Sequence, residues 1–204
     1  MIVVVGEALI DLVLRPSGEM APHPGGGPYN AARALARLEV PTAFLGRLST
    51  DRFGRMLREA LVADGVAVDT VELTADPTTL ALAELDEQGS ASYHFYVAGT
   101  SVPALSVESA LARYPEHVDA LHVGTLALVL DPLADAVEAL VARAPSQATM
   151  VFVDPNIRPL LIADRAHYLA RLARVMDRAD VVKLSSDDLA WLTPDRSTQE
   201  AATE

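Results

Sequence analysis

Short apolar stretches rich in β-branched residues recur along the whole chain. They predict buried strands at residues 1–5, 42–45, 119–123, 150–153 and 180–184. Stretches with helical periodicity lie between these strands. Strands that alternate with helices of ordinary length indicate an α/β fold with a doubly wound, mostly parallel sheet.

Three helices can be placed from their patterns and their ends. Residues 52–64 carry apolar side chains on one face and stop at Gly65, and residues 165–178 show the same periodicity. A third helix is predicted over 132–143, with Asp131 as its N-cap and proline at its first position.

Two further segments have strand character but do not fit this alternation. Residues 9–14 alternate loosely and lead into a region rich in proline and glycine. Residues 80–97 read as a hairpin whose turn covers 86–90 and whose second strand places Tyr93, Phe95 and Val97 on one face. Strands outside a parallel sheet predict a small β appendage on the main domain.

Composition narrows the class of protein. The 204 residues are 50% hydrophobic and 22% charged, which is typical of a globular domain. The net charge of −12 argues against nucleic acid as a partner, and no apolar run has the length of a membrane span. There is no cysteine and no basic segment ahead of an apolar one at the start, so we expect a cytoplasmic protein.

The segment Gly25-Gly26-Gly27-Pro28-Tyr29-Asn30 is the strongest candidate for binding chemistry. Three glycines allow a ligand to approach the backbone, and an alanine-rich helix follows whose first N–H groups are free. Asn30 adds a donor and an acceptor, which suits a ligand rich in hydroxyl groups. The segment matches neither nucleotide-loop pattern, which disfavours a dinucleotide-dependent oxidoreductase. A flexible loop before an ordinary helix is the alternative.

Two polar clusters follow predicted strands. Asp11 lies shortly after the first strand, where α/β sheets bind ligands, and it could accept hydrogen bonds from two hydroxyl groups or could be a capping carboxylate. The run 154–159 reads DPNIRP and offers Arg158 to a phosphate or carboxylate. Its alternative is a proline-locked turn in which Arg158 pairs with Asp154. The histidines show no metal-ligand spacing, and we expect them to be structural or solvated.

The segments GEALID, GGGPYNAARALARL, FLGRLSTDRFG, DPNIRP and KLSSDDLAWL, in this order, resemble the PfkB carbohydrate kinases, especially the fructokinase-like bacterial members. The resemblance covers nearly all of the chain. It implies a ribokinase-like α/β domain over residues 1–204 whose lid strands come from about 9–24 and 80–101. The substrate-binding residues it implies are Asp11, Gly26, Gly27, Asn30, Phe95 and Arg158, with Arg158 also a possible phosphate contact.

The same resemblance implies transfer of the ATP γ-phosphate to a hydroxyl of a fructose-like sugar, with Mg²⁺. Lys183 and Asp188 are the expected nucleotide contacts, with the alternative that Lys183 only flanks the strand. The family's Asn-x-x-Glu element reads Ser-x-x-Asp at 185–188, so no metal ligand is assigned. Val97 stands near a position where relatives usually carry arginine, which makes an acidic sugar less favourable. The lid is expected to pair two subunits as a homodimer.

The family's Gly-Ala-Gly-Asp segment, which supplies the catalytic base, is absent from the sequence. We therefore expect a truncated chain that lacks the C-terminal third of the family fold and is inactive alone. A capping-box pattern at 197–200 predicts a helix that starts just before the sequence ends. The alternative is a non-catalytic sugar-binding or assembly protein of the same fold, with these residues as its polar tail.

Overall fold

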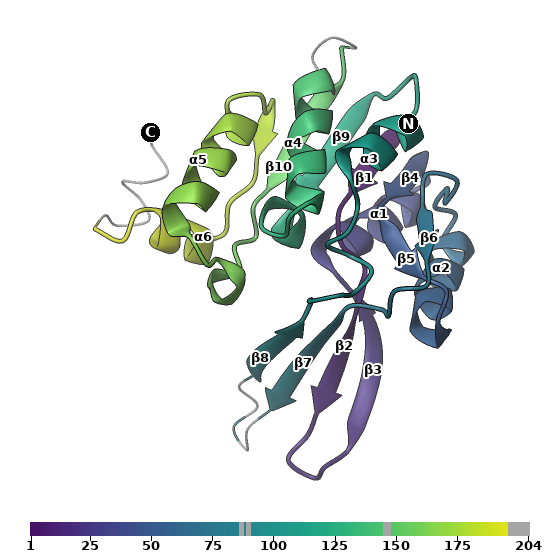
Figure 1. The fold of residues 1–204 in the computed structure, drawn as a ribbon, viewed down its shortest axis with the longest axis vertical. Helices are drawn as coiled ribbons and strands as arrows, with labels where there is room; N and C mark the ends of the chain where they lie inside the picture. Colours follow the sequence, from purple (N-terminus) through teal and green to yellow (C-terminus); the bar gives the residue numbers. More distant parts are fainter. Residues whose placement is uncertain (86–87, 89–90, 145–147, 196–204) are drawn as a thin grey trace.

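The computed structural model describes residues 1–85, 88, 91–144 and 148–195, so the predicted turn at 86–90 lies largely outside the described residues and the predicted helix start at 197–200 entirely so. A five-stranded sheet forms the centre of the body (Figure 1), and its paired strands are parallel, in the order β11-β10-β9-β1-β4. The strands are β1 (Ile2–Val5), β4 (Thr42–Leu45), β9 (Ala120–Gly124), β10 (Met150–Asp154) and β11 (Val181–Val182).

Helices cover both faces of this sheet because its strands are apolar on both sides. Along β1, Val3 and Val5 belong to one core cluster while Val4 belongs to a second one. The first cluster lies under α3 (Val107–Arg113), α4 (Leu133–Arg143) and α5 (Arg165–Met176). The second lies under α1 (Gly27–Arg37) and α2 (Arg52–Ala63), as Figure 1 shows behind the sheet. The predicted doubly wound architecture is confirmed.

The helix ends can be compared with the predicted ones, although the N-cap of α2 was not among the predictions. Asp51 caps α2 by accepting from the Gly54 N–H at 2.8 Å, and Gly65 follows the helix with φ of +88°. The prediction for α4 is wrong in one respect, because Pro132 is the N-cap and the Asp131 side chain makes no cap bond. Asp131 instead contacts Arg171 at 2.8 Å, because that guanidinium is almost fully buried and needs acidic partners.

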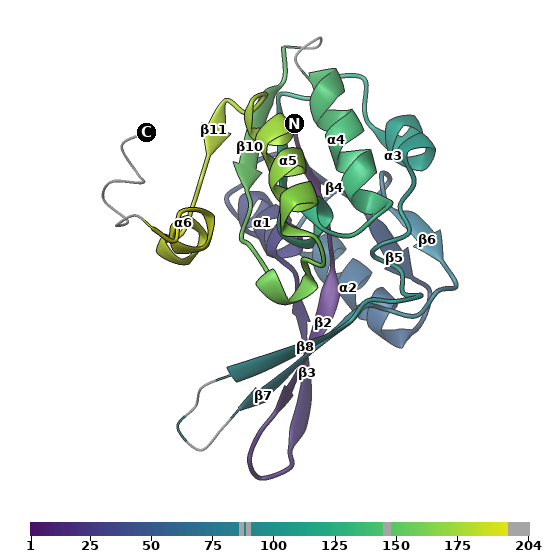
Figure 2. The same cartoon turned by 60° about the vertical axis from the view of Figure 1, so that its left-hand side comes forward.

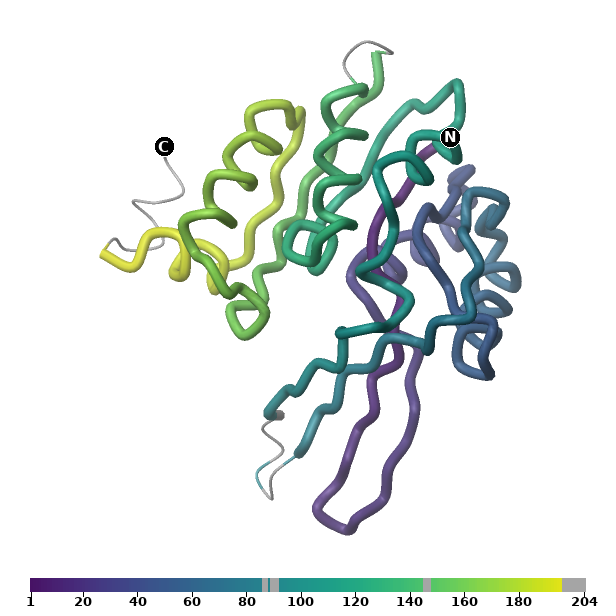
Figure 3. The backbone as a smooth tube through the Cα atoms, viewed as in Figure 1, coloured from purple at the N-terminus to yellow at the C-terminus, as the bar shows by residue number. Residues whose placement is uncertain are grey.

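A second sheet of four strands projects from the body in all the ribbon views (Figures 1 and 2). Its order is β3 (Met20–Gly25), β2 (Leu9–Leu14), β7 (Leu80–Leu85) and β8 (Ala91–Tyr96), and β2 pairs with β7 in parallel. Two prolines in β3 are tolerated because β3 is an edge strand. In the tube of Figure 3 the chain enters this sheet after β1 and returns to the body at α1.

Some elements were not predicted or differ from the prediction. The pair β5 (Arg47–Ser49) and β6 (Glu72–Thr74), α3, and α6 (Ser186–Leu192) were missed, since three-residue strands and seven-residue helices carry little periodic signal. The strand expected through Val97 ends at Tyr96, and Thr100 then bonds back to the Val97 carbonyl in a turn. None of the described helices combines the length and apolar character that crossing a membrane requires.

Candidate functional site

The glycine segment forms a tight turn at the N-terminus of α1. Gly26 has φ of +113°, and a Cβ at this position would lie 2.6 Å from the Glu7 carbonyl oxygen. A Cβ on Gly27 would collide with the Thr125 hydroxyl. Only glycine therefore fits position 26, and a larger residue at position 27 would force the Thr125 hydroxyl to move. Close packing thus holds this turn in place, in contrast to a flexible loop.

Asp11 lies on β2, on the face of the lid that turns toward this glycine turn. Its carboxylate is in contact range of Gly25, and its partner across the strand pair is His23. Burial raises the pKa of Asp11, while the positive charges of His23 and Arg158 oppose that rise. No hydrogen bond to the carboxylate is formed by the described residues, so both of its oxygens remain available to a ligand.

A cavity of about 460 Å³ lies where the lid meets the carboxyl ends of the body strands. All six residues predicted to bind substrate line it: Asp11, Gly26, Gly27, Asn30, Phe95 and Arg158. Sequence reasoning missed other residues in its wall, chiefly Glu7, Leu9, Tyr93, Thr125, Leu126 and Asn156. The signal for Glu7 was available, since it follows the first strand just as Asp11 does.

Arg158 is held in place by its own turn. Its Nη1 donates to the Asn156 side-chain oxygen at 2.8 Å and to the Asn156 and Ile157 carbonyl oxygens at 3.0 and 3.1 Å. All the hydrogen bonds that the described residues show for Arg158 leave from Nη1, so Nε and Nη2 remain for a ligand. The alternative pairing with Asp154 is wrong, because Asp154 pairs with Lys183 at 3.1 Å.

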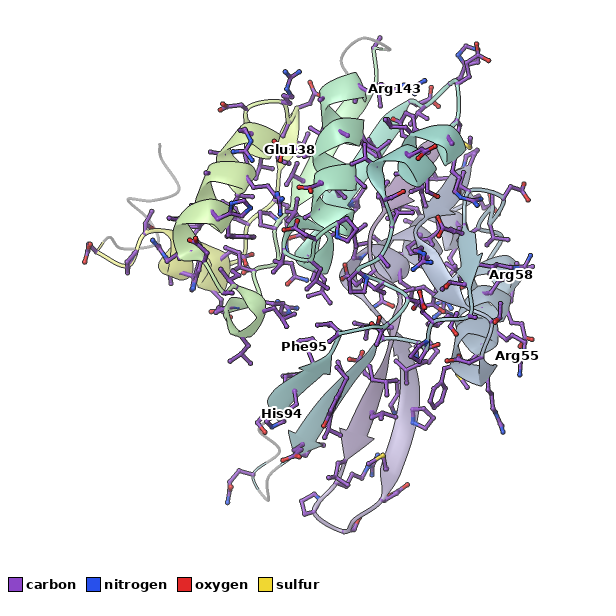
Figure 4. All side chains as sticks on the ribbon, in the orientation of Figure 1. Arg55, Arg58, His94, Phe95, Glu138 and Arg143 are labelled. Atoms are coloured by element: carbon purple, nitrogen blue, oxygen red, sulfur yellow. The ribbon has the colours of Figure 1, made fainter. Side chains whose placement is uncertain are left out.

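An aromatic wall closes the lid side of the cavity. The rings of Tyr93 and Phe95 stack on β8 with centroids 6.3 Å apart and an interplanar angle of 18°. Figure 4 shows Phe95 projecting from β8 near the body, with His94 farther out on the same strand. Leu126 packs against Leu9 and Ala81 beside this wall. Apolar faces of this kind suit the C–H surface of a carbohydrate ring.

Lys183 and Asp188 are not among the residues that line the cavity. Asp188 is buried and accepts three hydrogen bonds, from the Ile157 N–H at 2.7 Å, the Ser185 N–H at 2.9 Å and the Ser185 hydroxyl at 2.7 Å. Burial raises its pKa, but these hydrogen bonds outweigh burial and hold the pKa below its ordinary value. A carboxylate so fully engaged does not fit Mg²⁺, and Lys183 is already paired with Asp154.

Glu7 is the acidic residue buried deepest in the cavity wall. Its side chain has no exposed surface, and its Oε1 accepts from the Gly27 N–H at 3.0 Å. Burial raises its pKa to about 8, while the amides of Glu7 itself, Gly27 and Leu126 and the charge of Arg158 act to lower it. At neutral pH it is therefore mainly a neutral acid.

A doubly wound α/β body, a β-sheet lid and a polar cavity between them define a class of proteins that enclose a small polar ligand at strand ends. Hydroxyl groups are the ligand chemistry that a free carboxylate, an exposed amide and helix N–H groups match.

Comparisons with known proteins agree with this class of ligand-enclosing α/β proteins. The pfkB family carbohydrate kinase model matches residues 1–204. The chain therefore belongs to the pfkB family of carbohydrate kinases. A fructokinase from Rhizobium leguminosarum bv. trifolii is 37% identical over 195 residues, which is 94% of this chain and 59% of the relative. A fructokinase from Vibrio alginolyticus is 32% identical over 95% of this chain and 63% of its own length.

Solved structures show the same fold. A fructokinase from Vibrio cholerae O395, crystallised with fructose, ADP and calcium ion, has a TM-score of 0.87 and 29% identity over 99% of this chain and 65% of its own. A fructokinase from Xylella fastidiosa has the same TM-score and identity and is covered to 67%. The chain thus spans about 60–70% of these relatives, in agreement with the expected resemblance to the N-terminal part of a family member.

Proposed function

We propose that this chain is the sugar-binding part of an ATP-dependent sugar kinase whose substrate is fructose or a closely similar neutral sugar. The observation that carries the proposal is the meeting of Asp11, the Gly26-Gly27 turn, Asn30 and Arg158 around one cavity. The likeness to fructokinases, one of them crystallised with fructose, supports the choice of sugar.

The cavity residues have separate roles in this proposal. The Asp11 carboxylate accepts hydrogen bonds from two sugar hydroxyl groups, and Asn30 donates to and accepts from a third. Phe95 covers the apolar face of the sugar ring. Arg158 lies beside the reacting hydroxyl, where its free nitrogens stabilise negative charge as phosphate arrives.

Catalysis needs a group that this sequence does not carry. A base must take the proton from the sugar hydroxyl, and the Gly-Ala-Gly-Asp segment that supplies it in the family is not in the 204 residues. ATP is the proposed donor, because a related fructokinase from Xylella fastidiosa was crystallised with ATP. The described residues contain no group of three or more His, Cys, Asp or Glu side chains that could hold a metal ion, so no step through Mg²⁺ is assigned to them.

The outer face of the lid is the proposed dimer surface in the cytoplasm. Met20 and Tyr96 lie on the lid face opposite Asp11 and are 52% and 55% exposed. Leu82 lies on the same face between them, whereas Leu12 packs against the core cluster under α1 and α2. The exposed apolar side chains of this face are the ones offered to a second copy of the lid. Light scattering of the purified chain at high concentration tests this, and a strict monomer would contradict it.

Two measurements on the 204-residue chain test the function. Calorimetric titration with D-fructose is expected to show saturable binding at one site per chain. A coupled assay of ADP release with ATP, magnesium and a panel of sugars is expected to show no turnover by this chain, since the base is missing. Absence of binding to any sugar of the panel would refute the sugar-binding role. Turnover would show that one of the cavity carboxylates acts as the base.

A further inference from the structure

Glu7 stands at the junction of three backbone segments that build the cavity. It lies between β1 and β2, and its Oε1 accepts the Gly27 N–H at 3.0 Å. The amide of Leu126, in the 3₁₀ turn after β9, also faces its carboxyl group. Its Oε2 is buried and has no hydrogen-bond partner among the described residues. The carboxyl group thus connects the end of β1 with the glycine turn and the 3₁₀ turn.

The glycine turn packs closely against Glu7. A Cβ on Gly26 would lie 2.6 Å from the carbonyl oxygen of Glu7 and 3.3 Å from its Cγ. Thr125 touches Gly27 and accepts from the Asn156 side chain at 3.2 Å. A change in the Glu7 side chain would therefore be transmitted through the turn to the segment that carries Arg158.

We propose that Glu7 is a positioning residue, which in its neutral form holds the glycine turn and the 3₁₀ turn in the arrangement that binds sugar. This inference rests on the proposed sugar-binding function. An ionised carboxylate with one buried oxygen unpaired is costly, whereas a neutral acid still accepts from Gly27 through its carbonyl oxygen.

The charged groups that face Glu7 do not offset that cost. Arg158 acts on it at a distance, but its hydrogen bonds go to Asn156 and Ile157. Asp11 lines the same cavity and brings no positive charge to Glu7. Burial accordingly raises the pKa of Glu7 to about 8.

The first test needs no ligand. Hydrogen exchange at the Gly27 amide is measured by NMR in the wild-type chain, Glu7→Gln, Glu7→Leu and the exposed control Glu59→Gln. The glutamine amide reproduces the neutral acid and keeps an acceptor, so exchange should stay within about twofold of wild type. Leucine fills the space without an acceptor, so exchange should be at least about tenfold faster. Equal exchange rates in all four chains would overturn the proposal.

The second test separates a neutral from an ionised Glu7. The native state binds the Glu7 proton more tightly than the unfolded state, so this contribution to stability is full below the ordinary pKa of 4.5 and is lost as pH rises toward about 8. The urea midpoint of the wild-type chain should fall over this window relative to Glu7→Gln. A difference in urea midpoint between wild type and Glu7→Gln that does not change with pH would refute the neutral form of Glu7. This comparison does not involve Glu7→Leu, so it remains decisive if that variant does not fold.

Fructose titration completes the design. Glu7→Gln should bind with an affinity within about twofold of wild type, and Glu7→Leu should bind at least about tenfold more weakly. If the wild-type chain binds neither fructose nor any other sugar of the panel, the proposed function fails, while the exchange and pH results still decide the role of Glu7. If wild type and Glu7→Leu bind equally well, the positioning role fails and the proposed function stands.

Discussion

Asp11 and Asp188 each follow a strand of the central sheet, but their carboxylates meet different surroundings. Asp11 faces the cavity, and none of the described residues donates a hydrogen bond to it. Asp188 is the third residue of α6 and is enclosed in a capping box with Ser185, while it also accepts from the Ile157 N–H. One carboxylate is available to a ligand and the other is used by the fold.

The difference shows why a residue type at a strand end does not by itself define a binding site. At Ser185–Asp188 the acidic member of the family element is present, but its hydrogen-bonding capacity serves the helix start and the turn that leads into Arg158. Asp188 therefore acts on the site indirectly, because it accepts from the Ile157 N–H and so holds the turn that leads into Arg158. Mutations should separate these two kinds of role, since one affects folding and the other affects ligand affinity.

The largest effect is expected for Asp188→Ala. It removes the Asp188 half of the capping box, so that the Ser185 N–H and hydroxyl lose their acceptor, and it leaves the buried Ile157 N–H without an acceptor. The free energy of unfolding should therefore fall by about 2–4 kcal/mol. Urea denaturation measures this. Asp187→Ala, at the exposed neighbouring position, is the matched control and should change stability by less than about 0.5 kcal/mol. Equal effects of the two substitutions would remove the structural role of Asp188.

Sequence patterns located the body strands well for a physical reason. Strands β1 and β4 are buried on both faces, and β9 and β10 are buried on one face and partly covered on the other, so each appears as a mostly apolar run. The pair β5 and β6 was missed because strands of three residues, with Arg47 bound to Glu72, show no such run.

The site was partly predictable for the same reason. Asp11 and the glycine turn stand out in the sequence because their residue types are unusual beside apolar segments. Glu7 was missed although it follows the first strand, and Asp131 was wrongly placed as a helix cap. The partners that define their roles, Gly27 and Arg171, come from distant parts of the chain. Such contacts depend on the packed structure and leave no local signature.

The pH dependence of fructose affinity should distinguish the two aspartates further. Burial raises the pKa of Asp11, so its carboxylate is protonated at a higher pH than an ordinary aspartate. Protonation removes an acceptor, and affinity should therefore fall as pH drops, by at most about tenfold per pH unit. Titrations between about pH 4 and pH 7 measure this, with Asp11→Asn as the control that should lose the dependence. An affinity that rises on acidification would contradict the assigned role.

The smallest effect is expected for Lys183→Ala. The lysine side chain is 50% exposed and pairs with Asp154 outside the cavity, and such pairs contribute about 0–1 kcal/mol to stability. Fructose affinity should stay within about twofold of wild type, because Lys183 does not line the cavity. Calorimetry on the purified variant checks this. A loss of tenfold or more would mean that the sugar site extends to β11.

The central claim is that the free carboxylate of Asp11 binds the sugar in the cavity between lid and body. Calorimetric titration of D-fructose into the wild-type chain and into Asp11→Asn tests it most directly. The account predicts one site per wild-type chain and a loss of about 1–3 kcal/mol of binding free energy in the variant, with the urea midpoint unchanged or raised. Equal affinities for the two chains, with both folded, would contradict it.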